Sequence, residues 1–283
     1  MNFAKQSNSP ILSRHAATRR GFFQLCAGVT AVALAEGLVE PFTLEAISHE
    51  IQLPNLPKAL DGLKVVQLTD PHRGELTPDS IIRAAIRQAA AWQPDLVVLT
   101  GDYVRWDAAD TLPFARLLEP LTPRLGMIGI LGNHDYEYPN RVARTLTDVA
   151  GVRMLRNANL EVASGLWVSG IEDTWKGIPD PAEALQSVSG DAALLFLTHN
   201  PVGVRYVQDR PCIALSGHTH GGQFRVPGIA PHFPPGMEGF AQIDGWGTYD
   251  KARLYISRGI GCTAYPIRLN CPPEVTLFTL RAA

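Results

Sequence analysis

The sequence predicts an α/β fold with two β-sheets, and three features of the chain lead to this prediction. In the first half of the domain, apolar and β-branched runs alternate with stretches whose apolar residues recur at helical spacing. This alternation is typical of parallel strands joined by helices. Further along, strand-like runs follow one another with few helices between them, which indicates a second sheet. A length of 283 residues is sufficient for one large domain with its own core.

The first half supplies three predicted strands, each followed by a helix. An apolar run over residues 63–69 follows the turn Asp61-Gly62 and reads as a buried strand. Thr77-Pro78 then offers an N-cap with proline in the first turn, and apolar residues recur at helical spacing over 82–89. The same reasoning predicts strands at 96–100 and 127–131, and helices near 114–118 and 141–149.

Short strands dominate the second half. We expect them at 152–155, 160–163, 166–171, 192–197 and 212–215. Two further runs, at 252–257 and 275–280, are expected to pair and close the second sheet. Three prolines within residues 36–60 disfavour long regular structure there. We therefore expect a leader at 36–60 and a domain at 61–283.

The first 35 residues have the layout of an export signal. Arg19-Arg20 precedes Phe22 and a weakly polar stretch from Gly21 to Ala35, which ends in the A-x-A sequence typical of a cleavage site. The stretch is shorter than the roughly 20 apolar residues that span a bilayer. Paired arginines resemble a twin-arginine signal, which would engage the twin-arginine translocation machinery. An ordinary secretory signal, a disordered basic tail and an uncleaved membrane anchor are the alternatives.

Charge is distributed unevenly along the chain. Residues 1–35 hold four basic residues and no acidic one, whereas the whole chain has 25 basic and 27 acidic residues. The remaining 21 basic residues leave residues 36–283 with a formal charge of −6. Such an acidic body is unsuited to binding nucleic acid through a broad basic face. The ordinary apolar content of 46% also argues against wholesale disorder and against a polytopic membrane protein.

Three cysteines remain beyond the predicted signal, namely Cys212, Cys262 and Cys271. None has the C-x-x-C spacing of a zinc or redox site. We expect buried thiols, and a disulfide between Cys262 and Cys271 is the alternative for an exported protein.

Polar residues that bind metals follow five of the predicted strands. The five clusters are Asp70-Pro71-His72, Gly101-Asp102, Gly132-Asn133-His134-Asp135, His199-Asn200 and Gly217-His218-Thr219-His220. Ligands of open α/β sheets bind beyond the carboxyl ends of the strands, so these clusters are expected to meet in one crevice. Each cluster alone is a weak signal, because many such residues mark only turns or packed side chains. Their common position at strand ends makes a shared site the better explanation.

The donor set suits divalent metal ions. Carboxylates, imidazoles and one amide, without thiolates, favour first-row ions such as manganese, zinc, iron or nickel. The donors outnumber those that one tetrahedral ion uses. Two ions about 3.5–4 Å apart, bridged by one carboxylate, would use all of them, and such a pair activates a water and clamps phosphoryl oxygens.

The series of clusters resembles the motifs of the calcineurin-like metallophosphoesterases, and all of these motifs occur in order between residues 63 and 223. The resemblance implies a four-layer α/β/β/α sandwich of two mixed sheets flanked by helices. It implies that one metal ion is bound by Asp70, His72, Asp102 and His220. Asp102 would bridge to a second ion, also bound by Asn133, His199 and His218. His134 would protonate the leaving oxygen, oriented by Asp135, and an imidazole is a competent general acid near neutral pH.

Segments outside these motifs resemble a narrower group, the exported bacterial phosphodiesterases of the YaeI and YkuE type, related to UDP-2,3-diacylglucosamine pyrophosphatases. They are the arginine-rich leader, Gly221-Gly222-Gln223 and residues 257–275. The resemblance implies a phosphodiesterase or pyrophosphatase, with a nucleotide-linked glycolipid of lipid A synthesis as one candidate substrate. It also implies a periplasmic or cell-envelope location, with peripheral membrane contact as one option. The sequence does not indicate an oligomeric state.

Two other functions are considered. A non-catalytic module that binds metal or headgroups would normally have lost a ligand, and this chain has lost none. A nuclease is disfavoured by the acidic body, although metal ions would compensate locally. For a glycolipid, an apolar groove is expected beside the metals, and the candidates to line it are Phe233, Met237, Phe240 and Trp246, which would otherwise pack internally. Arg73 is expected either to reach a second phosphate or to face solvent.

Overall fold

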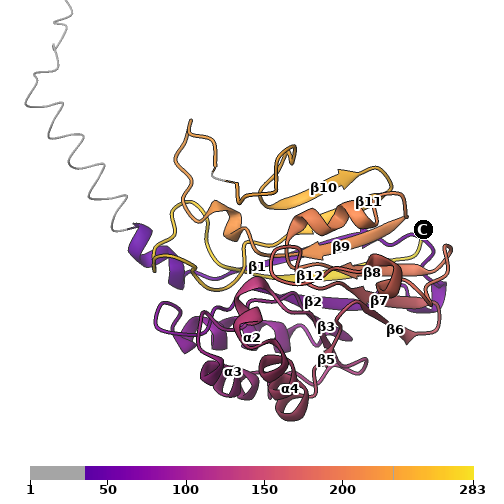
Figure 1. Ribbon diagram of the computed structural model, residues 1–283, viewed down its shortest axis with the longest axis horizontal. Coiled ribbons are helices and arrows are strands. Elements are labelled where there is room, and N and C mark those ends of the chain that lie inside the picture. The colour runs from indigo at the N-terminus through magenta and orange to yellow at the C-terminus, as the bar shows by residue number, and fades with distance from the viewer. Residues whose placement is uncertain (1–35, 232) are drawn as a thin grey trace, which may run out of the picture. The chain divides into compact units, whose positions relative to one another are not determined.

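Two six-stranded sheets form the centre of the protein in the computed structural model, which describes residues 36–231 and 233–283 (Figure 1). The predicted export signal at residues 1–35 lies outside the described residues. Within the described part of the chain, no helix is long and apolar enough to cross a membrane.

The first sheet contains the strands of the first half of the chain and one strand from the C-terminus. Its order is β1 (Glu45–Gln52), β12 (Glu274–Arg281), β2 (Lys64–Leu68), β3 (Leu96–Leu99), β4 (Met127–Gly129) and β5 (Arg153–Met154). Strands β2 to β5 are parallel, whereas β12 runs antiparallel to β2. Its outer face is covered by α2 (Asp79–Ala91), α3 (Thr111–Leu117) and α4 (Pro139–Ala150) (Figure 1).

The second sheet is built from the later strands. Its order is β10 (Gly245–Tyr249), β11 (Ala252–Ile256), β9 (Cys212–Ser216), β8 (Ala193–Leu197), β7 (Leu166–Gly170) and β6 (Ala158–Ala163). The four central strands are parallel, and β10 and β6 at the edges are antiparallel to their neighbours. Its outer face is covered by short elements, α5 (Pro181–Ala184) and the 3-10 helix η5 (Pro201–Tyr206).

Three apolar clusters correspond to the three interfaces between layers. Val97 packs under α2 with Ile82, on the outer face of the first sheet. Val98 and Leu195 belong to the cluster between the two sheets. Phe196 lies in the cluster on the outer face of the second sheet. Neighbouring residues of one strand therefore face different clusters, as the two-residue period of a strand requires. This arrangement confirms the predicted α/β sandwich of two mixed sheets.

The expected pairing of residues 252–257 with 275–280 is wrong. Strand β11 pairs with β9 and β10 in the second sheet, whereas β12 lies in the first sheet between β1 and β2. The reason is that β12 is apolar on both faces. Val275 and Leu277 contact the helix-covered cluster, and Phe278 and Leu280 contact the cluster between the sheets. Such a strand needs both faces covered, and the first sheet has helices on one face and the second sheet on the other.

Two strands were not expected. Residues 36–60 contain the eight-residue strand β1, which pairs in parallel with β12 along its whole length. Its alternating charged and apolar residues suit an edge strand, and the prolines at 54 and 57 lie beyond its end. The glycine-containing strand β10 was missed because glycine disfavours strands.

The three cysteines in the described residues are buried free thiols. This confirms the expectation of buried thiols, and burial raises the pKa of each thiol. Cys271 has a structural contact, because its Sγ donates to the carbonyl oxygen of His220 at 3.1 Å.

Candidate metal centre

The polar clusters predicted to converge do meet at one edge of the two sheets. Strands β2, β3 and β4 bring Asp70, Asp102 and Asn133 from the first sheet, and β8 and β9 bring their histidines from the second. The side chains form three overlapping groups, and within each group the potential ligand atoms lie within 4.8 Å of one another. Together the groups include all the predicted histidine and aspartate ligands. The carboxyl ends of parallel strands explain the convergence.

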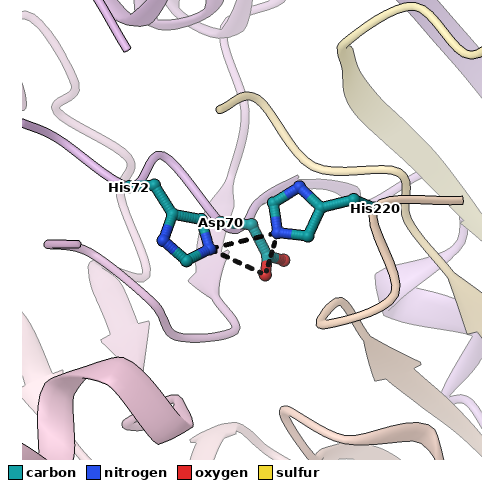
Figure 2. A group of neighbouring side chains, drawn as sticks. All are labelled: Asp70, His72 and His220. Carbon is teal, nitrogen blue, oxygen red and sulfur yellow. Dashed lines mark hydrogen bonds and ion pairs between the residues drawn. The ribbon is translucent and has the colours of Figure 1, made fainter. Parts of the chain in front are cut away.

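The first group contains Asp70, His72 and His220, all of them buried (Figure 2). The Nε2 atoms of the two imidazoles are 3.0 Å apart. Asp70 Oδ1 lies 3.3 Å from His220 Nε2 and 3.8 Å from His72 Nε2. Three donor atoms of different residues therefore point at one small volume, as Figure 2 shows.

The second group surrounds His199. Its Nε2 lies 3.1 Å from Asn133 Oδ1 and 3.2 Å from His218 Nδ1. The third neighbour of this nitrogen is Asp102 Oδ2, at 3.2 Å. Four donor atoms converge here, which is the number that a tetrahedral ion with protein ligands uses.

Asp102 belongs to both groups through a single oxygen atom. Its Oδ2 is 3.3 Å from His72 Nε2 in the first group and 3.2 Å from His199 Nε2 in the second. Its other oxygen, Oδ1, accepts a hydrogen bond of 2.8 Å from the backbone N–H of His134. This bond fixes the carboxylate so that Oδ2 is free to bridge two ions.

The proton positions on two imidazoles argue that cations belong between these groups. His199 Nδ1 donates to Thr100 O at 2.8 Å, and His220 Nδ1 donates to Gly261 O at 3.0 Å, because a carbonyl oxygen only accepts. In the neutral rings, both Nε2 atoms therefore carry lone pairs. These lone pairs face nitrogens of His218 and His72 at 3.2 and 3.0 Å. Such an arrangement needs a proton or a metal ion between the nitrogens. Burial opposes a charge on His199, but the Asp102 carboxylate raises the pKa of this imidazole well above its usual value, so a proton serves in the free protein. A divalent ion would use the same lone pairs, so the residues present fit divalent ions.

Electrostatics keep the carboxylates ionised. Burial by itself raises the pKa of Asp70, but the adjacent His220 holds the pKa of this carboxyl below its ordinary value. Burial likewise opposes the charge of Asp102, and His199 and His72 hold its pKa well below the usual range. Burial lowers the pKa of His218 to about 3. Anionic carboxylates and a neutral imidazole are the protonation states that bind metals.

Two glycines stand where the chain passes directly over the carboxylates. A Cβ at Gly132 would lie 2.2 Å from Asp102 Oδ1, and a Cβ at Gly217 would lie 2.0 Å from Asp70 Oδ2. Neither position tolerates a side chain without moving the carboxylate. This close approach explains why glycine precedes the polar residues in these two motifs.

We expect Gly217→Ala to weaken metal binding at least about tenfold, because the added methyl group displaces the Asp70 carboxylate. Gly190→Ala is the matched control, since a methyl group added there would have no other atom within 4 Å. Metal affinity is measured by competition with a coloured chelator. Equal affinities for the two variants would show that Asp70 does not need its present position.

Several of the candidate ligands have left-handed backbone conformations, which residues other than glycine rarely adopt. Positive φ angles occur at Asp70 (51°), His72 (42°), Asp102 (56°), His218 (73°) and His220 (48°). Each such residue costs of order 1–3 kcal/mol, so the fold stores strain at this site. Strain of this kind is concentrated where geometry serves function.

This strain predicts an unusual order of stability. In the metal-free protein, His72→Gly should be more stable than His72→Ala by about 1 kcal/mol, because glycine adopts positive φ freely. The exposed helical position Arg83 in α2 is the control, where Arg83→Gly should be the less stable of the pair by about 1 kcal/mol. Chemical denaturation measures both differences. The same order at both positions would contradict stored strain at His72.

His134 lies beside the two groups and lines the cavity in front of them. Its Nδ1 lies 2.7 Å from the carbonyl oxygen of Arg105, to which it donates. Burial lowers the pKa of His134, although the charge of Asp102 opposes this effect. Its ring also packs between Trp106 and His72, with centroid distances of 4.3 and 4.7 Å.

The expectation that Asp135 orients His134 is not what the structure shows. The buried Asp135 carboxylate accepts hydrogen bonds from the backbone N–H groups of Asp102 (2.8 Å), Tyr103 (3.0 Å) and Gly132 (2.9 Å). Asp135 therefore ties together two of the strand-end loops, and the Arg105 carbonyl orients His134. A carboxylate at the start of a short helix accepts hydrogen bonds from backbone N–H groups that point at it, and here these bonds occupy both oxygens of Asp135.

Arg73 has a structural role and does not reach the centre. Its guanidinium pairs with Asp110 and with Asp79, at 2.9 Å to the latter. The expectation that it contacts a second phosphate therefore has no support in the structure.

Two kinds of site residue were missed from the sequence. Asp173 follows β7, is buried, and accepts hydrogen bonds of 2.9 Å from the N–H groups of Trp175 and Lys176. The rule that polar residues follow strands would have found it. Trp106 packs against His134 in a tilted arrangement and Trp175 contacts His218 edge-on, with centroid distances of 4.3 and 4.5 Å. No motif marks them, because exposed tryptophans have no fixed spacing.

The residues expected to line an apolar groove pack internally instead. Met237 and Phe240 are buried on the outer face of the second sheet, and Phe233 packs against them. Trp246 packs against the cluster between the sheets. The cavity in front of the centre is lined by other aromatic residues.

Comparison with known proteins assigns this geometry to a family. Residues 63–222 match the calcineurin-like phosphoesterase family. The chain is 31% identical to the metallophosphoesterase YkuE of Bacillus subtilis, with 96% of this chain and 98% of YkuE covered. It is 32% identical to the phosphodiesterase YaeI of Escherichia coli, with 93% and 99% covered. It is 25% identical to the UDP-2,3-diacylglucosamine pyrophosphatase LpxG of Chlamydia muridarum, with 84% and 90% covered.

Proposed function

This chain belongs to the calcineurin-like phosphoesterase family and is a metal-dependent phosphoester hydrolase, and we propose that it hydrolyses phosphodiester or pyrophosphate bonds with two divalent ions. The observation that carries the proposal is the single oxygen, Asp102 Oδ2, shared between two groups of donor atoms. One ion would be held by Asp70, His72, Asp102 and His220, and the other by Asp102, Asn133, His199 and His218.

The chemistry follows from the charges at the site. When bound, the two ions would activate a water molecule and neutralise charge on the phosphoryl oxygens. The protein's own residues hold the carboxylates in place through the Thr69 hydroxyl and the backbone N–H groups of His134 and His218. His134 is placed to deliver a proton to the leaving oxygen, because its Nδ1–H is fixed by the Arg105 carbonyl and its ring faces the cavity.

The phosphodiesterase assignment is supported by YaeI, and pyrophosphate hydrolysis by LpxG. On the similarity to LpxG, a nucleotide-linked glycolipid of the UDP-2,3-diacylglucosamine type is one proposed substrate. Manganese, zinc, iron and nickel all accept this donor set, so any of the four ions would fit the centre.

We further propose that the protein is exported, on the sequence pattern of residues 1–35 alone. Recognition by the twin-arginine translocation machinery would place a folded, metal-loaded enzyme in the cell envelope. Replacing Arg19 and Arg20 with lysine should keep the full-length protein in the cytoplasm, and unchanged export of that variant would contradict this route.

A substrate panel tests the enzymatic proposal. The purified and metal-analysed full chain is assayed against a phosphomonoester, a phosphodiester, cyclic nucleotides and UDP-2,3-diacylglucosamine. We expect turnover of at least one diester or pyrophosphate that disappears on chelation and returns with added metal. No turnover of any of these compounds by protein containing two metal ions would contradict the proposal.

A further inference from the structure

The cavity in front of the metal centre has a volume of about 370 Å³ and a wall of unusual composition. On one side it reaches donor atoms of the centre and His134. The rest of the wall is formed by ten other residues, Trp175, Thr219, Gly222, Gln223, Phe224, Pro234, Pro235, Thr263, Ala264 and Tyr265. Among these described lining residues there is no lysine, arginine, aspartate or glutamate.

Two polar side chains of this wall, those of Gln223 and Thr219, are occupied by the protein itself. Gln223 Nε2 donates to the carbonyl oxygens of Tyr265 (2.9 Å) and Ile267 (2.8 Å), and its Oε1 accepts from Thr263 N–H (3.1 Å). Thr219 Oγ1 donates to Ile243 O at 2.7 Å. These bonds hold the loops that form the wall, so the side chains of Gln223 and Thr219 are not free to bind a charged group.

Three arginines of neighbouring segments are also occupied. Arg225 pairs with Asp244 at 2.7 Å and donates to Gly221 O, and Arg258 pairs with Glu274 and Glu45 at 2.6 and 2.7 Å. Arg268 is buried and donates to four backbone carbonyls. A second phosphate in the cavity would therefore meet no free guanidinium among these three residues, and an anion without a cation partner binds poorly.

Three aromatic side chains provide the apolar part of the wall and are substantially exposed. Trp175 and Phe224 are each 42% exposed, and Tyr265 is 63% exposed. They belong to three different loops. Their apolar surface is in contact with water, and a ligand that covered this surface would gain binding free energy. Trp175 is held in place by its backbone bond to Asp173 and by edge contact with the His218 ring.

We infer that this cavity binds an uncharged, apolar substituent of the substrate, an aryl or acyl group attached close to the phosphate that the metals hold. The substrate class is therefore a phosphodiester with one phosphate at the metal centre, and a compound with a second phosphate in the cavity is disfavoured. This inference rests on the proposed function, because it assumes that the centre binds a phosphoryl group. It narrows that function to phosphodiesters and disfavours the pyrophosphates, which carry a second phosphate.

Binding of non-hydrolysable phosphonates tests the inference without turnover. Calorimetric titration of the metal-loaded full chain compares methylphosphonate, phenylphosphonate, hexylphosphonate and 3-phosphonopropionate. We expect the phenyl or hexyl compound to bind at least about tenfold more tightly than methylphosphonate, because its substituent is buried against the aromatic wall. The compound with the terminal carboxylate should bind no more tightly than methylphosphonate. A stronger gain for phenyl identifies an aryl group, and a stronger gain for hexyl identifies an acyl chain.

Variants separate the wall from the metal centre. Combined replacement of Phe224 and Tyr265 by alanine should abolish most of the tenfold preference and leave methylphosphonate binding and metal content unchanged. Tyr265→Ala alone should reduce the preference in part. Tyr206→Ala is the matched control, since Tyr206 is 41% exposed and does not line the cavity. Ala264→Lys should create a preference for 3-phosphonopropionate.

The outcomes distinguish this inference from the proposed function. Equal affinities for all four phosphonates, or tightest binding of 3-phosphonopropionate to the unchanged protein, would overturn the inference and leave the phosphoesterase function standing. No binding of methylphosphonate to protein with both metals would overturn the proposed function, and the inference with it.

Discussion

Asp102→Asn is expected to lower phosphodiesterase activity by about 10⁴-fold, because both proposed metal sites use the same oxygen of Asp102. Several kcal/mol of transition-state stabilisation are lost for each ion, and each 1.36 kcal/mol is a factor of ten in rate. Asparagine has nearly the same shape and can keep its Oδ1 on the His134 N–H. It would then place an NH₂ group, which cannot bind a metal, where Oδ2 stood.

The control for this variant is Asp148→Ala, which removes an exposed carboxylate on α4. The two proteins are compared by metal analysis and by kcat/KM on a phosphodiester. Asp148→Ala should match the unchanged protein in both measurements. If Asp102→Asn retained two metal ions and full activity, Asp102 would not be the bridging residue.

His134→Gln is expected to lower kcat by about 10²–10⁴-fold while the metal content stays unchanged. The reason is that the His134 ring faces the cavity but its Nδ1 is committed to the Arg105 carbonyl. Burial lowers the pKa of His134, so the ring is neutral in the free protein and must gain a proton to act as an acid. A bound phosphate anion next to the ring favours that protonation.

Leaving-group dependence distinguishes proton donation from other roles of His134. A p-nitrophenyl ester has a leaving group that departs without a proton, whereas an alkyl ester needs one. His134→Gln should therefore impair the alkyl ester far more than the p-nitrophenyl ester. Equal losses on both esters would exclude a general acid. Loss of a metal ion would instead make His134 a metal ligand, since it lies in a group with His72 and Asp102.

Local patterns in the sequence predicted the strands that carry the centre, and the reason is physical. Each of these strands is a short apolar run that ends at a polar residue, so both its extent and its end are visible in the chain. Strand partners are less visible, because pairing depends on distant residues. For this reason β12 was predicted in the second sheet but lies in the first.

The seven candidate metal ligands were predictable because metal donors are few in kind and follow strands. Their detailed support was not predictable. Asp135 binds backbone amides rather than His134, and the carbonyls of Arg105, Thr100 and Gly261 hold the histidines. Every residue has a backbone carbonyl, so the sequence cannot indicate which carbonyls accept hydrogen bonds from the histidines.

The cavity wall was the least predictable part of the site. Composition favoured the large apolar residues of the segment 233–246 for this wall, but Met237 and Phe240 are buried in the core. The actual wall combines Trp175, Phe224 and Tyr265 from three loops. Loop conformations depend on individual hydrogen bonds, such as those of Gln223, which no periodic pattern reveals.

Anomalous diffraction from a crystal of the manganese-loaded protein tests the central claim most directly. The arrangement of the donor groups predicts two peaks about 3.5–4 Å apart, both next to Asp102 Oδ2. One peak should also contact Asp70, His72 and His220, and the other Asn133, His199 and His218. A single peak, or two peaks of which one does not contact Asp102, would contradict a dinuclear centre bridged by this residue.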